Sequence, residues 1–271
     1  MYGSDELARL TESFNEMLKS LQESRERQSQ LVADAGHELK TPLTSLRTNI
    51  ELLMMASKNP SDTITPDDIA DLEHDVMSQL EELTNLVTDL VDLAREDSQH
   101  SVVEPIDLGE ILDGVIDRVR RRRLDIKFTF NLIDWYLMGD QRGLSRAFLN
   151  VLDNAAKWSP ENGTVTMTMQ QIDDDRVEIT VDDEGPGIPA DERELVFERF
   201  YRSVESRAMP GSGLGLAIVK QVMESHGGSV RAEESPRGGT RMVLELPGGP
   251  QITSNNNEAV SYTHLTLPTK A

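Results

Sequence analysis

This 271-residue chain carries three polar residues at helical spacing whose side chains could bind a charged ligand: Asn150, Asn154 and Lys157. The spacing predicts a helix with all three side chains on one face, because residues three or four apart lie one turn apart. Amide oxygens suit a hard divalent cation such as Mg²⁺, and a lysine ammonium neutralises phosphate. This face therefore predicts a site for a magnesium-bound triphosphate.

Two glycine-rich segments could bring backbone close to the same ligand. One follows Asp183, whose carboxylate ends a predicted strand and can accept a hydrogen bond from an adenine amino group. The other precedes a predicted helix, so its N–H groups can hold phosphates at the positive helix end. Glycine permits the close backbone approach that both roles need. The glycines are Gly185 and Gly187 in the first segment, and Gly211, Gly213 and Gly215 in the second.

A second set of polar residues lies on a long predicted helix near the N-terminus. The heptad pattern places His37, Glu38 and Thr41 on its outer face, so His37 is not a core histidine. Glu38 can hold the imidazole in one tautomer and accept a proton from it. Pro42 removes a backbone N–H and permits a local bend beside His37. Together these residues predict a nucleophilic histidine.

At this point five ordered motifs give a resemblance to the bacterial sensor histidine kinases. The first, around His37, is similar to the family's phosphoacceptor motif, most of all in actinobacterial envelope-stress kinases. The others are similar to the N, G1, F and G2 boxes. The motifs are His37-Glu38-Leu39-Lys40-Thr41-Pro42, Asn150-Val151-Leu152-Asp153-Asn154-Ala155-Ala156-Lys157, Asp183-Glu184-Gly185-Pro186-Gly187-Ile188, Val196-Phe197-Glu198-Arg199-Phe200-Tyr201-Arg202 and Gly211-Ser212-Gly213-Leu214-Gly215-Leu216.

The resemblance implies a role for each site residue. ATP and Mg²⁺ are the implied substrate and cofactor, with Asn154 as the metal ligand and Lys157 on phosphate. The resemblance also implies that His37 receives the phosphoryl group, helped by Glu38 and Arg202, and that Thr41 orients water for dephosphorylation of a response regulator. Trp158 either stacks on adenine or only packs in the core. Implied nucleotide contacts are Asn150, Asn154, Lys157, Trp158, Asp183, Gly185, Gly187, Gly211, Gly213, Gly215 and Leu216.

Two other functions remain to be weighed against a kinase. Gyrase-type and chaperone-type ATPases share the implied nucleotide fold, but they hydrolyse ATP with a glutamate where this chain has Asn150. An amide cannot take a proton from water, so Asn150 argues for transfer to a protein acceptor. The second alternative is a non-catalytic ATP-binding scaffold, and the completeness of all five motifs counts against it.

The helical elements that must carry His37 begin near the N-terminus. Residues 5–57 predict one long helix whose two apolar seams are offset by a four-residue stutter between Leu21 and Val32. The stutter is either a packing adjustment or a join between a signal-input and an output helix. Thr65-Pro66-Asp67-Asp68 predicts the start of a second helix that reaches about residue 97. We expect an antiparallel hairpin that dimerises into a four-helix bundle, because one hairpin cannot bury both apolar stripes.

A change of pattern near residue 100 predicts an α/β sandwich, with helices packed on one face of a mixed sheet. Helices are expected near 107–123, 140–157 and 213–226, and strands near 126–132, 135–138, 164–171, 175–182, 229–234 and 240–246. Residues 204–210 predict a mobile lid. The arginines at 118 and 120–123 are either an anion contact or, as we favour, the solvated end of a helix.

The expected fold class is α+β, a dimeric hairpin bundle followed by an α/β sandwich of the Bergerat or GHKL type. The expected divisions are a HAMP-like helix and linker at 1–27, a dimerisation and phosphotransfer domain at 28–99, an ATP-binding domain at 100–248, and a disordered tail at 249–271. Phosphoryl transfer within or between subunits depends on the handedness of the loop at 58–66, so both are consistent with the sequence.

Composition limits the partners and the compartment. The absence of cysteine excludes disulfides and thiolate metal sites, and a net charge of −21 argues against binding to nucleic acid. No run approaches about 18 apolar residues, so we expect membrane attachment only through N-terminal segments outside this sequence. The expected assembly is a homodimer that recognises a response regulator, as the cytoplasmic portion of a cell-membrane protein.

Overall fold

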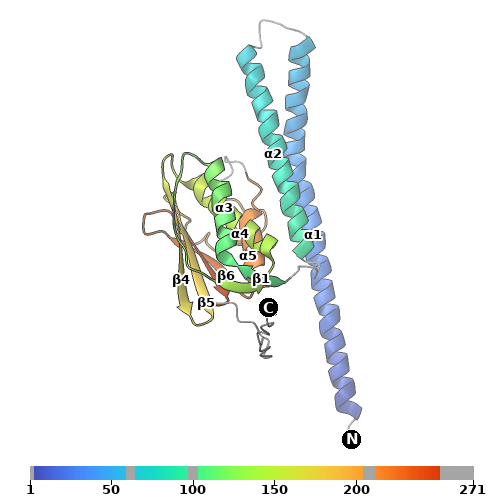
Figure 1. Ribbon diagram of the computed structural model, residues 1–271. Coiled ribbons are helices and arrows are strands. Elements are labelled where there is room, and N and C mark those ends of the chain that lie inside the picture. The colour runs from blue at the N-terminus through green and yellow to red at the C-terminus, as the bar shows by residue number, and fades with distance from the viewer. Residues whose placement is uncertain (1–2, 59–64, 97–102, 204–210, 251–271) are drawn as a thin grey trace, which may run out of the picture.

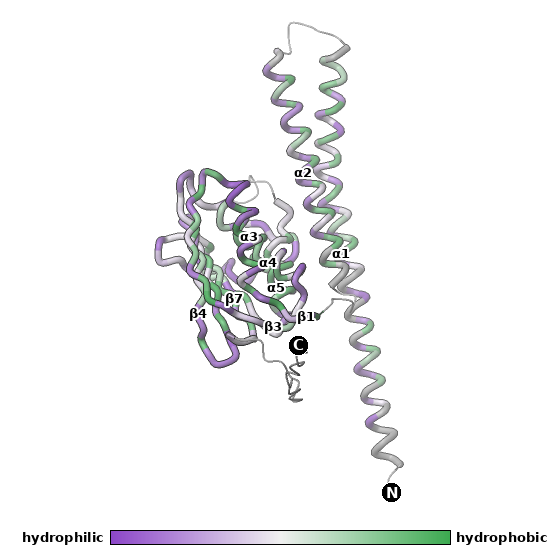
Figure 2. Tube along the Cα trace, viewed as in Figure 1, coloured by the Kyte–Doolittle hydropathy of each residue, from purple (hydrophilic) through white to green (hydrophobic). Residues whose placement is uncertain are grey.

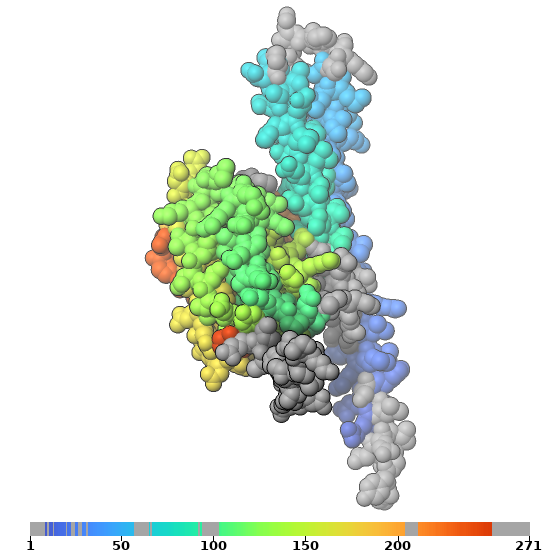
Figure 3. Space-filling model, in the orientation of Figure 1, coloured from blue at the N-terminus to red at the C-terminus, as the bar shows by residue number. Residues whose placement is uncertain are grey.

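The computed structural model describes residues 3–58, 65–96, 103–203 and 211–250, and it forms a helical hairpin beside an α/β domain (Figure 1). The hairpin consists of α1 (Gly3–Lys58) and α2 (Pro66–Glu96). The α/β domain lies directly against α2 in the space-filling view (Figure 3). The hairpin that carries His37 and the α/β domain that carries the predicted nucleotide-binding motifs are therefore in contact.

The start of α2 is fixed by its predicted cap. Asp68 N–H donates to Thr65 Oγ1 at 3.1 Å, and Thr65 N–H donates to Asp68 Oδ2 at 2.8 Å, which makes a reciprocal capping box. These hydrogen bonds from Thr65 also lower the pKa of Asp68. Further along the hairpin, Gln79 Nε2 donates to Ser45 Oγ at 2.9 Å, and this contact marks the register between the two helices.

Large apolar side chains remain exposed along both helices of the single chain. Figure 2 shows apolar and polar residues alternating along both helices. Many large apolar side chains exposed together on two helices are typical of an interface. The exposed set on the two helices is Phe14, Met17, Leu18, Leu21, Val32, Leu43, Ile50, Leu52, Met54, Met55, Met77, Leu80, Val87 and Val91.

The α/β domain is built on a five-stranded mixed sheet with the order β2-β4-β5-β7-β6. All neighbours are antiparallel except β2 and β4, which pair in parallel. In β4 the alternate residues Val165, Met167 and Met169 are buried, as the sequence pattern predicted. The strands are β2 (Lys127–Asn131), β4 (Thr164–Asp173), β5 (Arg176–Asp182), β6 (Ser229–Glu234) and β7 (Thr240–Pro247).

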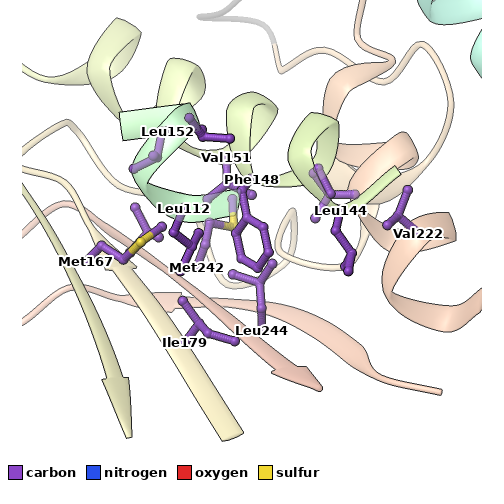
Figure 4. Packing of buried hydrophobic residues seen from close by; sticks show 14 of the residues in the cluster. Leu112, Leu144, Phe148, Val151, Leu152, Met167, Ile179, Val222, Met242 and Leu244 are labelled. Carbon is purple, nitrogen blue, oxygen red and sulfur yellow. The ribbon is translucent and has the colours of Figure 1, made fainter. Parts of the chain in front are cut away.

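Three helices cover one face of this sheet: α3 (Leu108–Arg122), α4 (Gln141–Trp158) and α5 (Gly215–Ser225) (Figure 1). Side chains of α3 and α4 meet the inner face of the sheet, where Phe148, Leu112 and Ile179 are fully buried (Figure 4). Asp107 and Asp140 cap α3 and α4 through their side-chain oxygens. This packing gives α4, which carries the N box, a rigid base.

Some elements were not predicted from the sequence. They are the short strand β1 (Glu104–Asp107) and a 3₁₀ turn η1 at Leu195–Phe197. β1 pairs antiparallel with β3 (Tyr136–Gly139), a strand that was expected near 135–138. An isolated antiparallel bridge also pairs Gly249 with Tyr136.

Three arginines of the run at 118–123 contact other residues of the α/β domain. Arg122 contacts Asp153 at 3.3 Å and Arg123 contacts Asp125 at 2.9 Å, while Arg120 lies 5.0 Å from the ring centroid of Phe130. These contacts hold the end of α3 to the rest of the domain, while Arg118 and Arg122 also line the cleft described below.

Several expectations fall on residues outside the described ranges. They are the lid at 204–210, most of the loop at 58–66, and the tail from 251 onward. Within the described ranges, no helix combines the length and apolarity needed to cross a bilayer.

Candidate functional site

One cleft of ≈ 1810 Å³ brings together most of the residues predicted to bind nucleotide. It opens between α4, the glycine-rich segment before α5, and the facing side of α2. Of the predicted residues, Asn150, Asn154, Lys157, Trp158, Gly187, Arg202, Gly211, Gly213, Gly215 and Leu216 line it.

The N box side chains on α4 are held by hydrogen bonds. Asn150 Nδ2 donates to the Gly215 carbonyl at 3.2 Å, which ties α4 to the first residue of α5. Trp158 Nε1 donates to Asn154 Oδ1 at 3.2 Å, and Lys157 Nζ lies 5.2 Å from the Trp158 ring centroid. The amide oxygen proposed as a metal ligand is therefore oriented by Trp158, a role that the sequence did not suggest.

Burial lowers the pKa of Lys157, and the nearby Arg202 lowers it further, while Glu82 of α2 opposes both effects. A Cβ built on Gly211 would lie 3.1 Å from Lys157 Nζ, so the ammonium lies directly beside the glycine-rich segment. Two half-buried cationic side chains and a glycine-rich loop thus converge at one end of the cleft. An anionic ligand such as a polyphosphate complements this end.

Asp183 lies beneath the cleft lining and is almost fully buried. Its Oδ1 accepts from Thr240 N–H at 2.8 Å and from Gly185 N–H at 2.9 Å. Burial raises the pKa of Asp183, whereas these hydrogen bonds act in the opposite direction. The carboxylate is therefore held in one orientation beside Thr240, which does line the cleft.

Gly239 and Thr240 are site residues that the sequence reasoning missed. A Cβ on Gly239 would lie 2.3 Å from the Asp183 carbonyl oxygen and 2.4 Å from Asp183 Oδ1. Only glycine fits at that distance, so Gly239 lets β7 approach the strand end that carries Asp183. The adjacent glycines before a β-rich segment, Gly238 and Gly239, were the available signal.

We therefore predict that Gly239→Ala lowers both the stability of the α/β domain and its affinity for ATP. The methyl group must push the Asp183 backbone or carboxylate aside, at a cost of about 1–3 kcal/mol. Thermal unfolding and ATP titration measure the two effects. Gly114→Ala is the matched control, because nothing lies within 4 Å of its added Cβ. Equal behaviour of the two variants would contradict the tight contact.

The glycine-rich segment is shaped by the preceding F box. Phe200 N–H donates to the Gly213 carbonyl at 3.0 Å, and a Cβ on Gly213 would lie only 2.9 Å from the Phe200 carbonyl carbon. Gly213 has φ +69°, which an L side chain rarely adopts. Leu214 N–H donates to Ser212 Oγ, and α5 begins at the next residue. The segment thus reaches the positive end of α5 in a shape suited to phosphate.

His37, Glu38 and Thr41 are not in this cleft. All three side chains are exposed on α1, on the outer face that the heptad pattern predicted. The Ser45–Gln79 hydrogen bond places His37, eight residues before Ser45, level with Val87, eight residues after Gln79. The glycine-rich segment contacts α2 at Glu82 and Asp89, on either side of Val87. The end of the cleft where phosphates are expected and His37 therefore lie at the same position along the long axis of the hairpin.

Two families match separate parts of the chain. The His Kinase A (phospho-acceptor) domain matches residues 27–99, and the Histidine kinase-, DNA gyrase B-, and HSP90-like ATPase matches residues 139–250. A solved structure called mycobacterial sensor histidine kinase MprB is 52% identical over 55% of this chain and all of that one, with a TM-score of 0.52. The chain belongs to the sensor histidine kinases.

Relatives of this histidine kinase include proteins named signal transduction histidine-protein kinase/phosphatase MprB. The Mycobacterium leprae protein is 59% identical over 94% of this chain and 50% of its own length. The Mycolicibacterium smegmatis protein is 59% identical over 91% and 51%. The chain thus spans about half the length of the curated relatives it matches. These matches agree with the resemblance to actinobacterial kinases.

A more distant solved structure, full-length ShkA in complex with AMPPNP, is 26% identical to this histidine kinase over 82% of this chain and 46% of that one, with a TM-score of 0.55. The predicted fold class, a helical hairpin followed by an ATP-binding α/β domain of the GHKL type, is confirmed. The roles of the individual site residues stay predictions.

Proposed function

We propose that this histidine kinase transfers the γ-phosphoryl group of ATP to His37 and then to an aspartate of a response regulator. The observation that carries the proposal is that His37 and the phosphate end of the cleft lie at the same position along the hairpin axis. The match of the phospho-acceptor family to residues 27–99 and of the ATPase family to residues 139–250 supports it. Asn150 argues against water as the acceptor, because an amide cannot act as a base.

The proposed step is an in-line displacement. A nitrogen of neutral His37 forms a bond to the γ-phosphorus while the bond to the β–γ bridging oxygen breaks and ADP leaves. Glu38 accepts the imidazole proton. Lys157 and Arg202 bind the phosphates, and the N–H groups of the glycine-rich segment hold them in place.

Magnesium fits the donors of the cleft. Asn154 Oδ1 is a half-buried amide oxygen beside the cationic end, which is an acceptable Mg²⁺ ligand next to phosphate oxygens. When bound, Mg²⁺ would neutralise charge on the phosphates. On the adenine side, we propose that Asp183 accepts the amino group, with Gly185 and Gly187 beside the base and Trp158 and Leu216 at the cleft wall.

The reverse activity, dephosphorylation of the regulator, is proposed for Thr41, which would orient water one helical turn from His37. Curated relatives carry both kinase and phosphatase in their names. We also propose that the chain is the cytoplasmic portion of a membrane sensor, since residues 4–24 resemble a HAMP helix, and that the division into the domains given above holds.

Incubation of the chain with γ-labelled ATP and Mg²⁺ tests the proposal. We expect label on the protein that survives alkali and is lost in acid, because a phosphoramidate bond behaves in that way. Release of free phosphate without labelled protein would instead support the hydrolytic alternative.

We predict a dimer formed through the hairpin. The exposed apolar stripes of α1 and α2 favour association by about 25 cal/mol for each Å² of apolar surface removed from water. Light scattering should give twice the monomer mass of 30.3 kDa at micromolar concentration. Replacement of Leu43 and Val87, which are both half-exposed in the single chain, by glutamate should yield monomers. A parent chain that is monomeric would contradict this prediction.

A further inference from the structure

The glycine-rich segment that is proposed to hold phosphate is already engaged by α2. Gly211 N–H donates to Glu82 Oε1 at 2.9 Å, and Ser212 Oγ donates to Asp89 Oδ2 at 2.9 Å. The other Asp89 oxygen forms an ion pair with Arg146 of α4. We call this set of five residues the α2–loop contact. It joins the two domains through carboxylates at the place where phosphates are expected.

The carboxylate of Glu82 has the surroundings of a bound phosphate. Besides the Gly211 N–H, it interacts electrostatically with Lys157, whose ammonium lies beside Gly211. A carboxylate oxygen and a phosphate oxygen are both anionic acceptors that prefer charge-assisted hydrogen bonds of this length. One N–H cannot serve both acceptors at full strength. Glu82 and a nucleotide phosphate therefore need the same donor.

The contact is supported by packing as well as charge. Leu86 and Leu93, on the same side of α2, are 4% and 1% exposed and belong to the cluster of buried residues that includes the core of the α/β domain. Asp89 and Arg146 are themselves only 14% and 23% exposed at their side chains. An ion pair with this little exposure is costly to break by removing one partner. The docked arrangement is thus a defined state and not a loose encounter.

We propose that α2 and ATP compete for the glycine-rich segment, so that the α2–loop contact is an autoinhibitory state in which Glu82 takes the place of a phosphate. The inference rests on the proposed function, since it needs ATP to bind this cleft. For a ligand that binds only the undocked state, the apparent affinity is the intrinsic affinity multiplied by the fraction of molecules that are undocked. Weakening the contact should therefore tighten ATP binding.

Two variants of the full chain test the competition, with binding of AMPPNP and Mg²⁺ measured by calorimetry. Glu82→Ala should lower the dissociation constant roughly three- to tenfold, because it removes the competing acceptor. Glu73→Ala is the matched control, since it removes the same charge from an exposed position on α2 that does not line the cleft. It should stay within about twofold of the parent.

Arg146→Gln separates competition from a general effect of charge. If only the electrostatic attraction between the cleft and the nucleotide matters, loss of a cation near the cleft should weaken binding of the anionic nucleotide. If the α2–loop contact competes, the same variant should bind AMPPNP more tightly than the parent, because Asp89 loses its partner.

Weaker or unchanged binding in both Glu82→Ala and Arg146→Gln would overturn the competition while leaving the proposed function intact. A parent chain that fails to bind AMPPNP would overturn the proposed function and the competition together. Circular dichroism of each variant shows whether it is folded, and the two substitutions lie in different elements, so each checks the other.

Discussion

His37→Gln should abolish transfer of phosphate from ATP to the protein while leaving nucleotide affinity close to that of the parent. His37 is exposed on α1 and does not line the cleft, so its loss removes the acceptor and no described contact of the nucleotide site. Glutamine has no nucleophilic ring nitrogen, and the expected loss is complete within detection. The measurements are protein labelling with γ-labelled ATP and a separate AMPPNP titration.

His74→Gln is the control for this substitution. His74 is also an exposed histidine of the hairpin, on α2, and should keep full labelling. Label that persists on His37→Gln would show that another residue accepts the phosphoryl group. Loss of label together with loss of AMPPNP binding would show a general defect and would contradict the separation of the two sites.

Asn154→Ala should reduce autophosphorylation by at least about a hundredfold, the scale of losing one preorganised contact to developing charge. The substitution removes the amide oxygen that Trp158 orients in the cleft. Dephosphorylation of the regulator should survive, because it depends on Thr41 and the hairpin. The measurements are the rate of His37 labelling and the decay of regulator phosphate with each variant.

Thr41→Ala should show the opposite pattern, with His37 labelled at the parental rate and regulator dephosphorylation slowed. Thr41 is exposed on α1, in a different domain from Asn154, so the two defects should separate. Thr44→Ala, three residues further along the same helix, is a control, because the Thr44 hydroxyl donates to the Lys40 carbonyl within the helix. Unchanged dephosphorylation in Thr41→Ala would assign Thr41 a purely helical role.

Local patterns in the sequence were enough to predict most elements. The Thr65 cap gave the start of α2, and the alternation of Val165, Met167 and Met169 gave β4, because both depend on residues a few positions apart. The parallel pairing of β2 with β4 and the pairing of β1 with β3 join segments that are far apart in sequence. Such pairings are set by the packing of the whole domain, which local periodicity does not contain.

The residues of the candidate site also divide into those that local motifs predict and those whose role depends on how distant segments pack. The chemical types of Asn154, Lys157 and Asp183 were visible in the sequence, because each motif is local. The need for glycine at 239 was not, because it arises from the approach of β7 to Asp183. No local motif in the sequence singles out Glu82 or Asp89. Their contact with Gly211 and Ser212 depends on how two domains dock, which no short pattern specifies.

The α2–loop contact also places a condition on catalysis. The glycine-rich segment bonded to Glu82 and Asp89 lies at the height of His37, but His37 itself is exposed outside the cleft. Phosphoryl transfer needs the reacting atoms about 3–3.5 Å apart and in line. If His37 is the acceptor, as we propose, the α/β domain has to leave α2 and move toward a His37 side chain, of its own chain or of the partner in the proposed dimer.

Mass spectrometry of the chain after incubation with ATP and Mg²⁺ tests the central claim most directly. Trypsin should release the peptide of residues 28–40, which contains His37 and one serine, Ser29. Fragmentation under neutral conditions, which preserve phosphoramidates, should place a single phosphate on His37. Phosphate on Ser29, or an unmodified peptide from a sample that has converted ATP to ADP and free phosphate, would contradict the account.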